Sequence, residues 1–158
     1  MDQRGALPVE VRFYRIEDRN QIEVIRCARR SWEREAQGVI RMAPSLFTGE
    51  GSEILVATSE NSVVGVAIFR ALPGICLIQS IGVRTSEWDR GVGTKLKKAV
   101  MVEVKERNPE GCMFLSFVHK MNGRMNHINQ NLQAVTAKSP DNSEYILTYI
   151  SVKLEDDI

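Results

Sequence analysis

The pattern of apolar and polar positions over the first third of the chain predicts one strand and one helix. Residues 9–16 alternate imperfectly between the two kinds of side chain, as a half-buried strand does. Asp18 then offers a helix N-cap, with Gln21 three residues later in a capping-box arrangement. The helix is expected to end near Gly38. Its apolar side carries Ile22, Ile25, Ala28 and Trp32.

Three strands joined by tight turns are predicted next. Residues 53–58 and 62–72 are rich in β-branched side chains, and the polar turn 59–62 between them indicates a hairpin. The Pro-Gly pair at 73–74 marks a further turn. The run 75–83 is apolar on both faces, so it is expected to lie centrally in a sheet.

Helices and strands alternate in the rest of the chain. We expect a helix over about 93–107, a strand over 112–118, a helix over about 122–132, a turn at 139–144 and a last strand over 145–154. The first of these helices buries Leu96, Ala99, Val100 and Val104. The order is strand, helix, three strands, helix, strand, helix and two strands, which is an α/β arrangement. A helix between two core strands requires a parallel pair with a right-handed connection.

Composition narrows the class of protein further. A chain of 158 residues suits one domain, predicted to span 1–158, and can bury a substantial core. Its 21 basic and 20 acidic residues nearly balance, which gives no signal for a nucleic-acid or membrane partner. No apolar run is long enough to span a bilayer, and the N-terminal residues lack the apolar stretch of a signal peptide. The cysteines Cys27, Cys76 and Cys112 have no paired spacing, which indicates reduced thiols in the cytoplasm.

The segment GVRTSEWDRGVGTKLKK, residues 82–98, carries the most distinctive candidate chemistry. Gly91 and Gly93 stand at the start of a predicted lysine-rich helix. Free backbone N–H groups at a helix N-terminus and the helix dipole together favour an anion. Arg90 and Lys95 add positive charge. The segment therefore predicts a phosphate or pyrophosphate site.

Two common phosphate-binding motifs do not fit this segment. A P-loop requires Gly-x-x-x-x-Gly-Lys-Ser/Thr, whereas Lys95 follows Thr94. The dinucleotide fingerprint Gly-x-Gly-x-x-Gly fails because Leu96 stands at the third glycine. No acidic residue ends a strand about 20 residues later either. From the two glycines alone, an ordinary turn stays an equal alternative.

The stretch SIGVRTSEWDRGVGTKL resembles the cofactor-binding motif of the GCN5-related N-acetyltransferases (GNATs), whose loop is usually Gln/Arg-x-x-Gly-x-Gly/Ala. Gly91 and Gly93 fall on the motif glycines, whereas Trp88 stands at the first position. The resemblance implies that the loop grips the pyrophosphate of acetyl-CoA and that strand 75–83 offers backbone groups to its pantetheine. The implied cofactor-binding residues are Ile81, Gly82, Val83, Trp88, Asp89, Arg90, Gly91, Val92, Gly93, Thr94, Asn122 and Asn126.

A second segment, FVHKMNGRMNHINQNLQA, resembles the downstream motif of the same family. Val118 and Asn122 match at the family spacing. The family tyrosine, often the acid that protonates the leaving CoA thiolate, falls on Asn129. The resemblance covers nearly the whole chain. It implies a mixed central sheet of about seven strands with flanking helices, splayed between the fourth and fifth strands.

Amide side chains form a stripe on the helix predicted at 122–132. Asn122, Asn126, Asn129 and Gln133 repeat at helical spacing, one residue after the apolar stripe of Met121, Met125, Ile128 and Leu132. A solvated polar face is one interpretation. Asparagine is a poor helix former, and the resemblance places Asn122 and Asn129 toward the cofactor. We therefore interpret the stripe as a wall that faces acetyl-CoA.

Acetylation of an amine requires a neutral nucleophile, and the predicted central strand supplies no carboxylate to deprotonate one. Gln79 and Ser80 on that strand can only position a water. His119 is the candidate base, because an ordinary histidine titrates near neutral pH. Tyr145 or Tyr149 could protonate the leaving thiolate, although surface and packing roles stay open for these side chains. The candidate catalytic residues are His119, Asn129 and Tyr145.

The expected function follows from the resemblance. It implies an acetyl-CoA-dependent N-acetyltransferase that moves the acetyl group directly to an amine of an unidentified acceptor, either a small molecule or a protein. The alternative is a CoA-binding or protein-interaction module that no longer transfers acetyl groups. Neither His119 nor His127 has a metal-ligand partner at a suitable spacing, so no metal is expected. A homodimer is a further expectation, because the last strand of this fold often lies at a dimer interface.

Overall fold

A computed structural model describes residues 8–27, 51–119, 123–138, 145–153, 156 and 158. The strands are β1 (Glu10–Phe13), β2 (Ser52–Ser59), β3 (Ser62–Leu72), β4 (Ile75–Val83), β5 (Cys112–His119), β6 (Val135–Lys138) and β7 (Tyr145–Val152). The helices are α1 (Arg19–Cys27), α4 (Val92–Arg107) and α5 (Gly123–Asn131), with short 3-10 turns η2 (Ile16–Asp18) and η3 (Thr85–Glu87). The seven strands form one sheet in the order β1-β2-β3-β4-β5-β7-β6.

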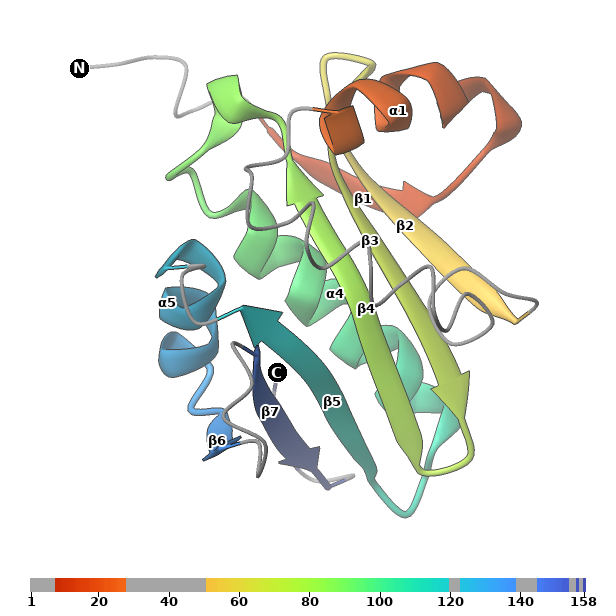
Figure 1. Cartoon of the computed structure of the whole chain (residues 1–158). Helices are drawn as coiled ribbons and strands as arrows, with labels where there is room; N and C mark the ends of the chain where they lie inside the picture. Colours follow the sequence, from red (N-terminus) through yellow and green to blue (C-terminus); the bar gives the residue numbers. More distant parts are fainter. Residues whose placement is uncertain (1–7, 28–50, 120–122, 139–144, 154–155, 157) are drawn as a thin grey trace.

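The sheet is mixed. Neighbouring strands are antiparallel except for β4 and β5, which run parallel. Between these two strands the chain passes through α4 (Figure 1). A helical crossover is the usual connection between parallel neighbours, because a tight turn reverses the chain and can join only antiparallel strands. The predicted α/β class, the central place of residues 75–83 and the parallel pair are confirmed.

The parallel pair separates after a short contact. Only three residues of β4 pair with β5, the last being Leu77 opposite Leu115. Just beyond, Ile78 and Ser80 pair with consecutive residues of β3, so Gln79 is the extra residue of a β-bulge. A bulge bends its strand and increases the local twist. β4 and β5 therefore diverge toward their C-terminal ends, as Figure 1 shows, and the splay expected between these strands is confirmed.

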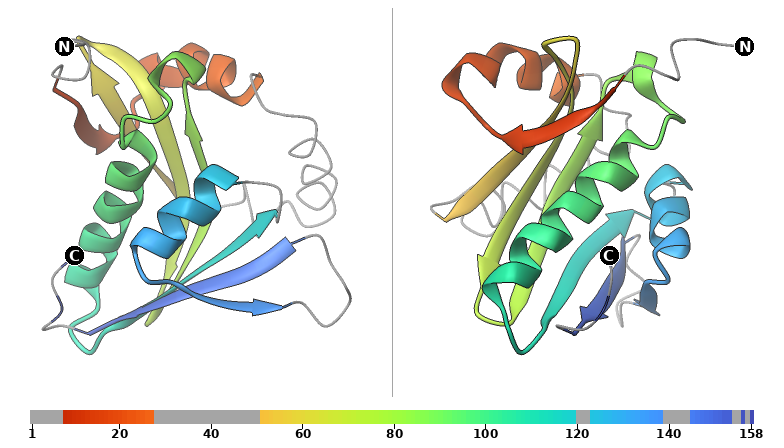
Figure 2. Two further views of the ribbon diagram at one scale, coloured as in Figure 1. Left: turned by 90° about the vertical axis from the view of Figure 1, so that its left-hand side faces the viewer. Right: turned by 180° about the vertical axis from the view of Figure 1, so that it is seen from behind.

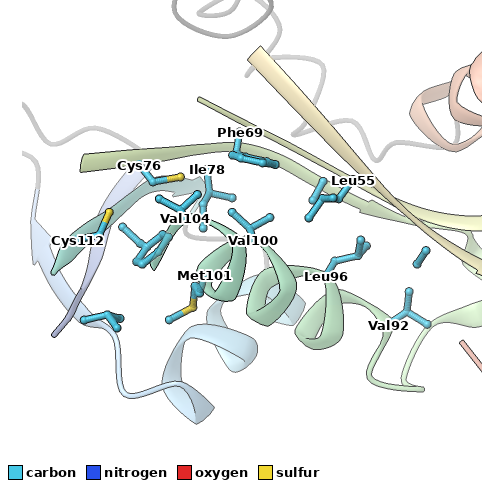
Figure 3. Packing of buried hydrophobic residues seen from close by; sticks show 14 of the residues in the cluster. Leu55, Phe69, Cys76, Ile78, Val92, Leu96, Val100, Met101, Val104 and Cys112 are labelled. Atoms are coloured by element: carbon cyan, nitrogen blue, oxygen red, sulfur yellow. The ribbon is translucent and has the colours of Figure 1, made fainter. Parts of the chain in front are cut away.

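Helices cover both faces of the sheet. Figure 2 shows α4 across one face and α1 on the other, near one end of the strands. The predicted stripe of α4 is buried, with Leu96, Val100 and Val104 all at 0% exposure, while Ala99 is half-buried. In Figure 3 this stripe points toward Phe69 and other apolar side chains of the sheet. The helix is thereby held firmly against the strands that it connects.

The N-terminal helix differs from the prediction at its start. Ile22 and Ile25 are buried against the opposite face of the sheet, as their spacing predicted. Asp18, however, is not a helix N-cap, because the turn η2 extends the helix toward the N-terminus. Its buried carboxylate accepts hydrogen bonds from the Arg15 backbone at 2.8 Å and from the Arg12 guanidinium at 2.8 and 2.9 Å. The Arg12 guanidinium holds the pKa of Asp18 below its usual range.

Some predicted features lie outside the described residues. These are the helix end near Gly38, the buried positions Ala28 and Trp32, and the turn at 139–144. The two other predicted turns are present. Glu60 and Asn61 adopt positive φ angles of 50° and 66° in the hairpin between β2 and β3, where a primed turn matches the strand twist.

Candidate active site

The loop between β4 and α4 is shaped by interactions among its own residues. Asp89 and Gly91 both adopt left-handed conformations, with φ of 65° and 78°. Asp tolerates this region better than most residues, and glycine enters it without strain. Arg90 forms an ion pair with Glu87 at 3.0 Å. The loop therefore reverses the chain and delivers it to Val92, the first residue of α4.

The N-terminus of α4 carries unpaired donors. The first helical hydrogen bond runs from Lys95 N to the carbonyl of Gly91 at 2.9 Å, and no side chain caps the helix. In the part of the chain that the structure describes, the amides of Val92, Gly93 and Thr94 have no hydrogen-bond partner. Free amides and the positive end of a helix dipole favour an anion. The phosphate or pyrophosphate site that the sequence indicates at this turn stays a prediction.

The two motif glycines have different structural roles. At Gly91 an added Cβ would meet nothing within 4 Å, but the φ of +78° would strain any other residue. At Gly93 an added Cβ would lie 2.9 Å from Ile128 Cδ1, on α5. Gly91 thus allows the turn and leaves space in front of the amides, whereas Gly93 allows close packing of α4 against α5.

One edge of β4 faces the splay. The amide of Arg84 bonds to the Val64 carbonyl on β3 at 2.8 Å, so by alternation Val83 and Ile81 turn their backbone groups to the other edge. No described strand pairs with that edge beyond Leu77. Gly82, between them, faces β3 with its backbone, and an added Cβ would lie 3.0 Å from Ile25 on α1.

Trp88 occupies the first position of the loop motif and contacts the last residue of β4. Its indole Nε1 donates to the Val83 carbonyl at 2.9 Å. The guanidinium of Arg124, from α5, lies 4.1 Å from the centre of the indole ring and also pairs with Asp89. Trp88 therefore holds the loop to β4 by a direct hydrogen bond, and Arg124 ties the same loop to α5.

Two arginines near the loop were not singled out by the sequence analysis. Arg124 is one of them. The other is Arg84, at the junction of β4 and the loop, whose Nε is buried and lacks a hydrogen-bond partner among the described residues. A buried cationic donor without an acceptor is unfavourable, and a bound anion would supply one. Arg84 follows Val83 directly, at the start of the segment that leads to α4.

The amide stripe of α5 does not form one wall. The helix ends at Asn131, so the exposed Gln133 lies beyond it. Asn126 is half-buried, whereas Asn129 is only 2% exposed. The apolar stripe is correspondingly less buried than predicted, since Met125 and Ile128 are half-buried. The helix is turned so that an amide, not an apolar residue, faces the interior.

Asn129 belongs to a buried polar cluster formed by Lys97, Asn129, Thr148 and Ser116. The Lys97 ammonium donates to Asn129 Oδ1, and Asn129 Nδ2 lies 3.4 Å from Thr148 Oγ1. Thr148 and Ser116 share a hydrogen bond of 2.6 Å between their hydroxyl groups. Each member comes from a different element: α4, α5, β7 and β5. The cluster therefore joins both helices to the strands on the β5 side of the splay.

Lys97 is the charged member of this cluster and was not predicted. Its side chain is 2% exposed, and burial lowers its pKa from 10.5 to about 8. Desolvation is the cause, because a buried ammonium loses the hydration that stabilises its charge. No local pattern distinguishes Lys97 from its neighbours Lys95 and Lys98, which are exposed.

The remaining candidate residues are placed only in part. The sheet register pairs His119, the last residue of β5, with Tyr145, the first residue of β7. The structure therefore brings these two predicted catalytic positions side by side at the open end of the splay. Asn122 lies outside the described residues.

The central strand contains no carboxylate, as its sequence requires. At the bulge, Gln79 Oε1 accepts a hydrogen bond from Ser52 Oγ at 3.1 Å. Over the described ranges, no three histidine, cysteine, aspartate or glutamate side chains are grouped as a metal site would need. None of the helices in the described part of the chain has the length and apolar character needed to cross a bilayer.

A family comparison agrees with this geometry. The model of the acetyltransferase (GNAT) family matches residues 16–128. The chain belongs to the GNAT family. The match includes the loop, α4 and most of α5, and the predicted resemblance is confirmed. No curated protein matches the GNAT chain.

Solved structures share the fold at low sequence identity. The ribosomal-protein-S18-alanine N-acetyltransferase of Escherichia coli has a TM-score of 0.70 and 15% identity, over 95% of this chain and 97% of that one. The PaiA N-acetyltransferase of Thermoplasma acidophilum, solved with coenzyme A, has a TM-score of 0.69 and 9% identity, over 90% and 98%. The Salmonella typhimurium protein yncA, solved with acetyl-CoA, has a TM-score of 0.62 and 15% identity, over 96% of each chain.

Proposed function

We propose that this GNAT protein transfers the acetyl group of acetyl-CoA directly to the amine of an acceptor. The observation that carries the proposal is the free N-terminus of α4 beside the splay between β4 and β5. An anion site next to an unpaired strand edge suits a ligand that joins a pyrophosphate to an amide-bearing chain. Coenzyme A has this construction, since its pantetheine arm carries amides that can pair with a strand edge.

The residues divide between the two parts of the cofactor. The pyrophosphate lies on the amides of Val92, Gly93 and Thr94, with Arg90 in the same loop to offset its charge. The pantetheine runs along β4, where Ile81 and Val83 present their backbone groups. Support for this cofactor comes from the similarly folded yncA and PaiA proteins, solved with acetyl-CoA and coenzyme A.

Deprotonation of the acceptor depends on the acceptor itself or on His119. A lysine amine of ordinary pKa must spend roughly 4–5 kcal/mol to become neutral at pH 7, whereas an α-amino group needs only about 1 kcal/mol. The central strand offers Gln79 and Ser80, which can orient a water but cannot hold its proton. We therefore propose an acceptor whose amine is partly neutral at pH 7, such as an α-amino group or an aromatic amine.

The first test is acetyl-CoA binding, measured as a change in the melting temperature of the protein. A ligand at 100 times its dissociation constant stabilises a protein by about 2.7 kcal/mol, so a clear rise in melting temperature is expected. The absence of any rise at millimolar acetyl-CoA would contradict the proposed function.

The second test is release of free CoA thiol from acetyl-CoA over a panel of amines. We expect α-amino and aromatic amines to react roughly a hundredfold faster than lysine side chains at pH 7, with rates that rise through the pKa of each amine. Binding without thiol release for any amine would favour a CoA-binding module instead. Fast acetylation of lysine side chains that survives His119→Ala would reveal a base other than His119.

A further inference from the structure

The buried polar cluster lies at the closed end of the splay. Ser116 immediately follows Leu115, the last residue of β5 that pairs with β4. The Ser116 hydroxyl is buried and bonds to Thr148 at 2.6 Å. Lys97 reaches this point from α4, one helical turn beyond Gly93, where α4 packs against α5. A ligand that enters along β4 from the N-terminus of α4 would bring its inner end toward this cluster.

Lys97 gives the cluster a positive charge that nothing described neutralises. The only acceptor that its ammonium meets in the described part of the chain is the neutral Oδ1 of Asn129. Burying an ammonium without a carboxylate costs free energy, so an apolar residue would serve packing better. A buried group with such a cost is more often retained for function than for stability.

The groups around Lys97 are neutral on every described element that packs there. Asn129 of α5, Thr148 of β7 and Ser116 of β5 are amides or hydroxyls. The charged or titratable side chains of α5, Arg124 and His127, are exposed. Tyr149 follows Thr148 and therefore faces the other side of the sheet, and desolvation alone perturbs Lys97. The charge at this point is therefore that of Lys97 itself.

Lys97 also decides how the Asn129 amide is oriented. Because Oδ1 accepts from the ammonium, Nδ2 is turned away from Lys97 and lies 3.4 Å from Thr148 Oγ1. One of its two N–H groups has no partner among the described residues. An amide polarised in this way is a stronger donor toward negative charge than an isolated one.

We propose that Lys97 provides the positive charge that stabilises the CoA thiolate as it leaves during acetyl transfer. The inference rests on the proposed function. The acceptor nitrogen forms a bond to the thioester carbon with its lone pair, and the carbon–sulfur bond breaks with its electron pair moving to sulfur. The proton displaced from the amine goes to water. Lys97 keeps its proton and acts through the Asn129 amide, so it is a positioning residue.

The experiment measures the pKa of the CoA thiol while CoA is bound. The ultraviolet absorbance of the thiolate is followed against pH at saturating CoA, with desulfo-CoA as the blank. The buried protein thiols titrate well above neutrality, since burial raises the pKa of Cys76 to about 12 and also that of Cys112. An opposite charge nearby lowers a pKa by one unit or more, so bound thiol should be about tenfold more ionised than free CoA near pH 7, where Lys97 is charged.

Three variants separate the possible causes. Lys97→Met removes the charge and the hydrogen bond, whereas Lys97→Gln removes the charge but still donates to Asn129. Both should return the thiol pKa close to that of free CoA. Lys98→Met makes the same change in net charge at an exposed position of the same helix and should leave it lowered. Lys97→Gln also keeps the test available if Lys97→Met does not fold.

The outcomes are distinct. The same thiol pKa in the native protein and both Lys97 variants, with CoA bound to all, would overturn the inference while leaving the proposed function in place. A lowered pKa that persists in Lys97→Gln would also overturn it, because the charge would not be the cause. No CoA binding by the native protein would overturn the proposed function and this inference together.

Discussion

The loop before α4 and the buried polar cluster meet α4 about one helical turn apart, at Gly93 and Lys97, but they are built in opposite ways. The loop is held by near neighbours, such as Arg90 with Glu87 and Trp88 with Val83. The cluster joins residues that are 32 positions apart between Lys97 and Asn129, and 19 between Asn129 and Thr148. Local chemistry can be read along a chain, whereas the cluster exists only after four elements have packed.

The largest expected effect is on the cluster. Asn129→Leu removes the one described acceptor of the Lys97 ammonium and leaves a buried charge without a hydrogen bond. We expect the free energy of unfolding at pH 7 to fall by about 3 kcal/mol, measured by urea denaturation. Adding Lys97→Met to Asn129→Leu should restore much of the loss, because the unpaired charge is then gone.

The exposed Asn131, on the same helix, provides a control for this change. Asn131→Leu should alter the free energy of unfolding by less than about 0.5 kcal/mol, as surface substitutions usually do. If Asn129→Leu were no more harmful than Asn131→Leu, the cluster would not be an energetic unit.

The pH dependence of stability should report Lys97 directly. Below about pH 8 the lysine is charged in both the folded and unfolded states, and the full cost of burial applies. Between about pH 8 and pH 10.5 the lysine is protonated in the unfolded state but neutral in the folded state. The free energy of unfolding therefore rises with pH in this range. The native protein should gain roughly 2 kcal/mol relative to Lys97→Met between pH 7 and pH 10. The measurement is urea denaturation of both proteins. A difference in free energy of unfolding that does not change with pH would contradict a lowered pKa of Lys97.

The loop should respond in ligand binding more than in stability. Gly91→Ala strains a φ of +78° and places a methyl group in front of the α4 amides. We expect a loss of about 1 kcal/mol in stability and an approximately tenfold weaker affinity for CoA, measured by calorimetry. Gly74, with φ of +75° and equally open surroundings, is a matched control in the turn between β3 and β4. Gly74→Ala should lower stability by a similar amount and keep full CoA affinity. Equal CoA affinities for the two variants would mean that Gly91 serves only the turn and not the ligand.

The smallest effect is expected where the loop meets α5. Arg124→Met removes the cation over Trp88 and the ion pair with Asp89, both at the surface. Such contacts contribute about 1 kcal/mol or less and are screened by salt. CoA affinity should fall by about threefold at low salt and be nearly unchanged at high salt. Arg107→Met, at the far end of α4, is the charge control, and a similar loss there would point to a general effect of net charge.

The sequence by itself determined most of the fold. Three local features act over short distances: the β-branched runs 53–58 and 62–72, the glycines before α4, and the stripe at Leu96, Val100 and Val104. Propensity, turn chemistry and helical periodicity are properties of neighbouring residues, so they can be recognised from the sequence alone. The resemblance to the family motif predicted the splay and the cofactor, which the periodicity of apolar residues cannot indicate.

The rotation of α5 and the state of Lys97 were decided only by tertiary structure. The spacing of Met125, Ile128 and Leu132 indicated an apolar buried face. Asn129 is nevertheless the buried residue, and its amide bonds to Lys97 and Thr148. A buried polar group is stable only if its partners arrive from elsewhere, and those partners lie on other elements. The bulge at Gln79 likewise depends on how β3 and β4 pair. These features depend on contacts between distant segments, which one-dimensional patterns do not encode.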